Sequence, residues 1–147
     1  MKNSLLVLEG IRKSFGARHI LDITRFELAA GESYVLTGEN GSGKTTLLRV
    51  LAGLDDAEVG ACRYEGRPFD LHTYPKWLRH DVIYVHQHPY LFRSSIVDNI
   101  SYGLKARGMA ASACEPLVRD AIAWAGVGDL LDVPPHSLSG GEKQRVA

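Results

Sequence analysis

Short apolar segments separated by turns occupy the first third of the chain. Residues 5–9 and 19–28 are rich in Leu, Ile, Val and Phe, and a turn around residues 14–17 separates them. Short apolar runs bounded by turn residues are typical of strands, so this region predicts two strands. Residues 32–37 (E-S-Y-V-L-T) form a third apolar segment, which we also interpret as a strand.

A helical pattern begins directly after a glycine-rich stretch at residues 38–43. Residues 44–52 carry three leucines on one face, which predicts an amphipathic helix. Residues 60–69 then predict a strand and a turn. Residues 81–85 (D-V-I-Y-V) predict another strand, which we expect to be buried.

The second half of the chain is predicted to be helical. Apolar positions spaced by one, three and four predict one helix from Ser95 onward and a second over residues 114–125. Ser139 stands where a helix N-cap should be, and Glu142 three residues later completes a capping box. This order of elements predicts an α/β fold with a helical insertion.

Residues 38–45 read G-E-N-G-S-G-K-T and match the pattern G-x-x-x-x-G-K-[ST] at every fixed position. The chemistry explains these residue types. Glycines let backbone N–H groups wrap a phosphate chain that larger side chains would block. Lys44 supplies a positive charge for the β and γ phosphates, and the Thr45 hydroxyl can reach Mg²⁺. An apolar segment before the loop and a helix after it are the context that this chemistry requires. The predicted nucleotide-binding residues of this region are Gly38, Glu39, Asn40, Gly41, Ser42, Gly43, Lys44, Thr45 and Thr46.

Composition excludes several other classes of protein. Lys plus Arg and Asp plus Glu both number 17, so the net charge is zero and gives no support for a nucleic-acid-binding surface. The N-terminal apolar run is too short for a signal peptide, and no stretch approaches the roughly 18 apolar residues of a membrane span. Cys62 and Cys114 lie far apart without CxxC spacing, which predicts two reduced thiols rather than a zinc site or a disulfide. We therefore expect a cytosolic protein without direct membrane insertion.

A second motif lies at residues 138–145, which read L-S-G-G-E-K-Q-R. Alone it could be a flexible turn with a good helix cap. With a phosphate-binding loop upstream, it resembles the signature motif of the ATP-binding cassette (ABC) ATPase family, with Glu142 where Gln is commonest. The resemblance implies that Ser139, Gly140, Gly141 and Glu142 of one subunit contact the γ-phosphate held by a partner subunit.

Two further positions resemble family motifs. Gln87, which follows the strand predicted at residues 81–85, looks like the Q-loop glutamine, and the resemblance implies that it reaches Mg²⁺ and the attacking water. His86 and His88 flank it, and we interpret them as loop residues because no third ligand completes a metal site. Phe15 resembles the aromatic residue that stacks on adenine; the alternative is a core Phe at the end of a strand.

The resemblance covers the whole chain and implies a P-loop NTPase fold of the ABC ATPase type, with an antiparallel β subdomain and a helical subdomain. We expect a partial domain over residues 1–147: a β and phosphate-loop core at about 1–86, the Q-loop and helical subdomain at 87–138, and the start of the signature helix at 139–147. No apolar strand ending in Asp-Glu follows the signature, and the family's switch histidine is also absent. We therefore expect a domain truncated after the signature motif, with little hydrolysis and marginal stability by itself.

The segments 91–100 and 102–108 are similar to ATPase subunits of bacterial solute importers, especially those for oxyanions such as tungstate or phosphate. The resemblance implies ATP and Mg²⁺ as cofactors, Lys44 and Gln87 as catalytic residues, and Thr45 and Gln87 as metal contacts. It also implies a membrane permease and a second ATPase subunit, identical or different, as partners at the cytoplasmic face of the inner membrane. Tyr90, Leu91 and Phe92 would receive the permease, or else pack locally.

Two alternatives stay open at this point. A non-transport ABC protein of translation or DNA repair would need a tandem cassette, a coiled coil or a basic surface, and none is present in these residues. The other alternative is a nucleotide-binding remnant with no catalytic role.

Overall fold

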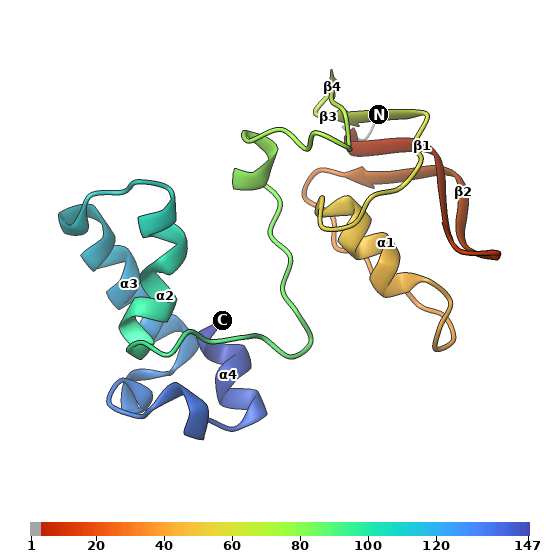
Figure 1. Cartoon of the computed structure of the whole chain (residues 1–147). Coiled ribbons are helices and arrows are strands. Elements are labelled where there is room, and N and C mark those ends of the chain that lie inside the picture. Colours follow the sequence, from red (N-terminus) through yellow and green to blue (C-terminus); the bar gives the residue numbers. More distant parts are fainter. Residues whose placement is uncertain (1–3) are drawn as a thin grey trace. The chain divides into compact units, whose positions relative to one another are not determined.

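The computed structural model describes residues 4–147, which form two compact units, residues 4–84 and residues 85–147 (Figure 1). Each unit has its own buried apolar cluster. Within residues 4–147, none of the helices has the length and apolar content needed to cross a membrane.

The first unit is built on a long antiparallel hairpin. Strand β1 (Ser4–Phe15) pairs with β2 (Arg18–Ala29), so the predicted strands at 5–9 and 19–28 are present and the first is longer than expected. The two strands turn through Gly16, whose φ of 58° is one that glycine adopts without strain. On its other edge β1 pairs with β3 (Ala61–Tyr64), and the short β4 (Arg67–Pro68) completes a sheet with the order β2-β1-β3-β4.

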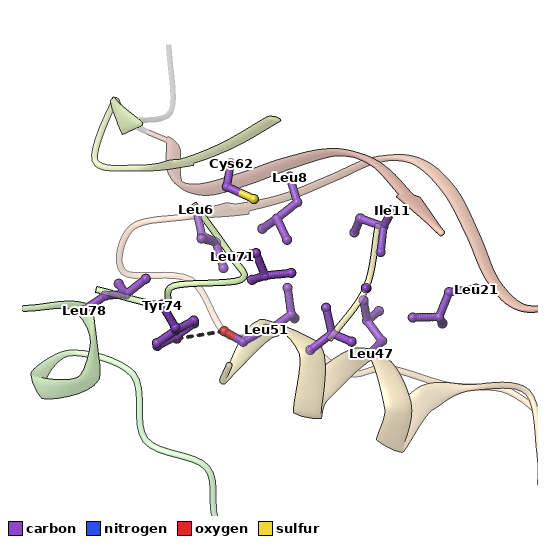
Figure 2. Close-up of a cluster of buried hydrophobic side chains, with 12 residues drawn as sticks. Leu6, Leu8, Ile11, Leu21, Leu47, Leu51, Cys62, Leu71, Tyr74 and Leu78 are labelled. Atoms are coloured by element: carbon purple, nitrogen blue, oxygen red, sulfur yellow. Dashed lines mark hydrogen bonds between the residues drawn. The ribbon is translucent and has the colours of Figure 1, made fainter. Parts of the chain in front are cut away.

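Helix α1 (Lys44–Leu51) packs its apolar side against this sheet. Figure 2 shows side chains of β1 on one side of the cluster and leucines of α1 on the other. Leu8 and Ile11 of β1 and Val50 of α1 are fully buried. The hydroxyl of Tyr74 donates a hydrogen bond to the Leu51 carbonyl at 2.9 Å (Figure 2), which joins the segment before the short 3₁₀ helix η1 (Leu78–His80) to the end of α1.

Two predicted strands are wrong. Residues 32–37 and 81–85 form no strand, and every residue from 31 to 40 is exposed. A strand needs a neighbouring strand to pair its backbone N–H and C=O groups. In the part of the chain that the structure describes, neither segment has such a neighbour. The apolar character of these two segments was therefore not enough to predict strands correctly.

The second unit is helical. Helix α2 (Ile96–Ala106) lies beside α3 (Ala111–Ala125), and α4 (Gly140–Val146) follows two 3₁₀ turns, η2 (Gly128–Leu130) and η3 (Pro135–Ser137) (Figure 1). The buried residues of this unit's cluster come from several of these segments: Ile96, Val127, Leu138 and Val146. The helices predicted from Ser95 and over 114–125 are present, the second beginning three residues earlier than expected.

Candidate functional site

The glycine-rich stretch forms an exposed loop that leads directly into α1. Gly38, Gly41 and Gly43 have φ values of 146°, 83° and 90°, a backbone region that L side chains rarely adopt. The Ser42 amide donates to the Glu39 carbonyl at 3.2 Å, and the Leu47 amide donates to the Gly43 carbonyl at 2.8 Å. The loop therefore reverses direction and passes into the first helical turn.

Lys44 folds back over this loop. Its ammonium donates to the carbonyl oxygens of Gly38 at 2.8 Å and Glu39 at 2.7 Å. Two neutral carbonyl dipoles hold the ammonium without cancelling its charge. The residue that follows, Thr45, is exposed on the first turn of α1, and Thr46 is half-buried. The structure thus places one cation and one accessible hydroxyl at the same helix start.

The start of α1 has no side-chain cap. Gly43 occupies the N-cap position, and the first turn holds no acidic residue. The amide groups of a first helical turn have no acceptor within the helix and carry a partial positive charge. An anion such as a phosphate group can accept hydrogen bonds from these amides and balance their partial positive charge.

Strand β2 lies close against the loop at its first residues. A Cβ added to Gly43 would sit 2.9 Å from the Ile20 carbonyl oxygen, and one added to Gly41 would sit 3.8 Å from the Arg18 guanidinium. Only a glycine at position 43 allows so close an approach. Phe15 ends strand β1 and is 59% exposed, so it does not pack in the apolar cluster of the first unit.

The remaining predicted residues lie in the second unit. Gln87 is exposed in the segment before α2, and its carbonyl oxygen accepts a hydrogen bond from the Gln144 side chain at 3.0 Å. Gln144 belongs to α4, so the two motifs of this unit are in direct contact. Sequence reasoning did not identify Gln144, although it lies within the quoted signature motif.

The predicted capping box at the start of α4 is present. The Glu142 amide donates to the Ser139 hydroxyl oxygen at 3.3 Å. The Glu142 carboxylate accepts from the Ser139 amide at 2.8 Å and from the Ser139 hydroxyl at 2.7 Å. These bonds, above all the one from the hydroxyl, hold the pKa of Glu142 below its ordinary value. Gly140 and Gly141 are exposed beside this closed pair.

A hollow of about 650 Å³ lies in the second unit. Tyr90 and Phe92 line it, with ring centroids 5.8 Å apart, and Phe92 also lies 4.6 Å from the ring of Tyr102. Leu91 packs against the apolar cluster of this unit, whereas Tyr90 is 76% exposed. Of the three residues expected to receive the permease, Leu91 is therefore partly buried, whereas Tyr90 and Phe92 are exposed.

The cysteines and histidines that could serve as nucleophiles or metal ligands do not form a site in the described residues. Cys62 and Cys114 are both free and buried, and burial raises the pKa of the Cys62 thiol to about 11. His86 and His88 are exposed. Across the described residues 4–147, His, Cys, Asp and Glu side chains nowhere gather in a group of three or more that could hold a metal ion.

Sequence reasoning also missed two cations of the first unit. Arg18 lies beside the phosphate-loop glycine Gly41, and Lys13 lies over the ring of Phe15. Alternation along a strand could have found Lys13, because residues two apart on a strand share a face. Nothing local to the sequence indicates that Arg18 approaches the loop.

A glycine-rich loop that wraps toward an uncapped helix start, under a lysine ammonium, is the arrangement that the phosphate-loop pattern of NTPases requires. The ABC transporter family model matches residues 21–147, and this chain belongs to that family. The fold, an α/β unit with an antiparallel sheet followed by a helical unit, agrees with the ABC ATPase class expected from the sequence.

The chain is similar to ATP-binding proteins of uptake systems and to a solved structure of an ABC transporter subunit. The molybdate/tungstate import ATP-binding protein of Thermococcus kodakarensis is 37% identical over 144 residues, which are 97% of this chain and 42% of that protein. The tungstate uptake system ATP-binding protein of Peptoclostridium acidaminophilum is 32% identical over 142 residues, covering 97% of this chain and 64% of that protein. The structure of cbiO1 from Clostridium perfringens, part of the ABC transporter complex cbiONQ, is 27% identical with a TM-score of 0.82, covering 99% of this chain and 59% of that one. The chain therefore spans between two fifths and two thirds of the length of these relatives.

Proposed function

We propose that this chain is the nucleotide-binding part of the ATP-binding subunit of an ABC importer. One observation carries the proposal: the Lys44 ammonium lies over the carbonyl oxygens of Gly38 and Glu39, beside the uncapped start of α1. A triphosphate supplies the negative charge and the hydrogen-bond acceptors that such a site lacks. The relatives named for import support the transport role.

Within this proposal the loop backbone from 38 to 43 wraps the phosphates, and Lys44 neutralises charge on the β and γ groups. The exposed Thr45 hydroxyl suits Mg²⁺, a hard cation that binds oxygen ligands and shares them with phosphates and water. The bound metal would supply neutralisation of phosphate charge.

The other site residues enter the proposal through the family resemblance. Gln87 would approach the metal and the attacking water, and Phe15 would stack on adenine. Ser139, Gly140 and Gly141, with Glu142 as the cap partner of Ser139, would meet a nucleotide held by a second ATPase subunit. Phe15 and Gln87 are both exposed, which supports the proposal that a bound nucleotide and its metal can reach them.

We propose a membrane permease as the other partner, at the cytoplasmic face of the membrane, with an oxyanion such as tungstate or phosphate as the solute. Both relatives described above carry tungstate in their names. The hollow lined by Tyr90 and Phe92 supports a permease contact on the second unit, because exposed aromatic side chains beside a concavity are typical of protein interfaces.

Isothermal titration calorimetry with Mg-ATP tests the nucleotide site on the 147-residue chain. We expect saturable binding by the unaltered chain and a loss of at least tenfold in affinity for Lys44→Ala, since a charge-assisted phosphate contact is worth about 1.5–3 kcal/mol. Circular dichroism confirms that each sample is folded.

Lys76→Ala is the matched control, because Lys76 is an exposed lysine of the same unit outside the loop. It changes the net charge equally and should leave the affinity unchanged. Folded chain that shows no affinity for Mg-ATP, or equal affinity for Lys44→Ala and the unaltered chain, would contradict the proposal.

A further inference from the structure

The aromatic ring at the end of β1 has a cation against it. The Lys13 ammonium lies 5.2 Å from the centroid of the Phe15 ring. Lys13 and Phe15 are two residues apart on β1 and so share one face of the strand. A cation at this distance attracts the ring face electrostatically. It can occupy only one face, and Phe15 as a whole is still 59% exposed.

The Lys13 ammonium is itself held from a second direction. It donates a hydrogen bond to the main-chain carbonyl of Asp56. A lysine side chain has four rotatable bonds and is normally mobile, so ordering its end costs rotamer freedom. A carbonyl partner at that end offsets part of this cost and restrains where the ammonium sits over the ring.

The segment that presents the Asp56 carbonyl is fixed on both sides. Before it, the Asp55 carboxylate accepts two hydrogen bonds from the Arg49 guanidinium, at 2.9 Å and 3.0 Å. After it, Glu58 exchanges two backbone hydrogen bonds with Arg12 of β1, at 2.8 Å and 2.9 Å. The ammonium therefore rests on a segment that is tied to both β1 and α1.

These contacts connect the ring to the phosphate loop. Arg49 lies in the last turn of α1, and Lys44 begins the same helix. A continuous set of contacts thus runs from the helix of the phosphate loop through Arg49, Asp55 and the Asp56 carbonyl to Lys13 and the Phe15 ring. A ring held in this way loses less freedom when a flat ligand stacks on it.

We propose that Lys13 is a positioning residue for the nucleobase, holding the Phe15 ring from one face so that the base stacks on the other. The inference rests on the proposed nucleotide-binding function and deepens it, since it gives a residue outside the phosphate-loop pattern a part in positioning the ring that receives the base. A phosphate chain without a base gains nothing from this arrangement, which separates the two functions experimentally.

Calorimetric titrations with Mg-ATP and with Mg-tripolyphosphate test the assignment. Lys13→Gln keeps an N–H donor for the Asp56 carbonyl and removes the charge, and Lys13→Arg keeps the charge. We expect Lys13→Gln to weaken ATP binding measurably but by no more than about fivefold, since the energy of an exposed cation–π contact sets the upper limit of this positioning effect. Tripolyphosphate binding should not change, and Lys13→Arg should bind ATP like the unaltered chain.

A double-mutant cycle with Phe15→Leu separates positioning from general stability. In the Phe15→Leu background, Lys13→Gln should have no further effect on ATP affinity, because the ring it acts through is gone. Lys76→Gln serves as the matched charge control. An equal loss of tripolyphosphate affinity, an unchanged or tighter ATP affinity in Lys13→Gln, or an undiminished effect in the Phe15→Leu background would each overturn the assignment.

The same titrations distinguish failure of this inference from failure of the proposed function. Unaltered chain that binds neither ligand would refute the phosphate site itself. Unaltered chain that binds tripolyphosphate as tightly as ATP would leave the phosphate site standing and refute the base platform.

Discussion

At the residue scale, hydrogen bonds between Ser139 and Glu142 close the start of α4 and set the pKa of the Glu142 carboxylate. The carboxylate accepts hydrogen bonds from both the hydroxyl and the amide of Ser139. Both bonds favour the charged form, and they outweigh the desolvation that opposes it, so the pKa of Glu142 lies below its ordinary value of 4.5.

We expect Ser139→Ala to raise the pKa of Glu142 toward 4.5, because the hydroxyl makes the largest contribution and the amide bond remains. Since the folded-state pKa is lowered, the cap stabilises α4 above the unfolded-state value and loses its effect as pH falls through the folded-state value. Titration of the Glu142 carboxyl carbon by NMR measures the change. Ser137→Ala, which removes a hydroxyl bonded to Pro134 instead, should leave that titration unaltered.

At the scale of elements, α1 is held by contacts that its own sequence does not contain. Its apolar side packs on β1, its last-turn Arg49 binds Asp55, and its Leu51 carbonyl accepts the Tyr74 hydroxyl. A helix of eight residues is not stable in isolation. The position of the phosphate loop therefore depends on these attachments.

Tyr74→Phe should lower the free energy of unfolding by about 1 kcal/mol at neutral pH, because it removes one buried hydrogen bond. Burial raises the pKa of Tyr74 to about 12 from 10.0, so its contribution is complete below pH 10 and is lost as pH rises toward 12. Urea unfolding between pH 7 and pH 12 should show a smaller alkaline decline in the variant than in the unaltered chain.

Tyr90→Phe is the control for this series, because Tyr90 is 76% exposed. It should match the unaltered chain at every pH. Cys62, whose thiol pKa is raised to about 11, contributes an alkaline decline to all three proteins alike. Equal alkaline declines in Tyr74→Phe and the unaltered chain would show that the Tyr74 hydroxyl is not protected by burial.

At the scale of the whole molecule, apolar residues are exposed to solvent in segments 32–37 and 81–85, which pair with no strand in the part of the chain that the structure describes. Val35 is 88% exposed and Ile83 is 74% exposed, both in segments that the sequence pattern favours as strands. Exposed apolar side chains that lie in such segments can drive association between chains.

We expect the double substitution Val35→Lys with Ile83→Lys to reduce self-association of the 147-residue chain, measured by static light scattering against concentration. Charged side chains at these exposed positions should change the free energy of unfolding by no more than about 0.5 kcal/mol each. Val50→Lys places the same charge in the core, where the residue is 0% exposed, and should unfold the first unit. Unchanged scattering in the double variant would show that association does not use these segments.

Much of the site could be predicted from the sequence because its signals are local. The glycines at 38, 41 and 43, the lysine that follows and the helix after them lie close together in the chain, and so do Ser139 and Glu142. Lys13 and Asp56, in contrast, are 43 positions apart, and nothing in either neighbourhood indicates the other. The strands expected at 32–37 and 81–85 failed for the same reason, since pairing is a property of two segments.

The sequence by itself was enough to predict the glycine-rich loop with Lys44 at a helix start, the helices with clear apolar faces and the resemblance to the ABC family. Backbone freedom of glycine, the charge of Lys44 and helical periodicity all act within a few residues. Only the tertiary structure decided which apolar segments become strands and what stands behind the Phe15 ring. Those outcomes depend on contacts between segments far apart in the chain, where each backbone group and each charge must find a partner.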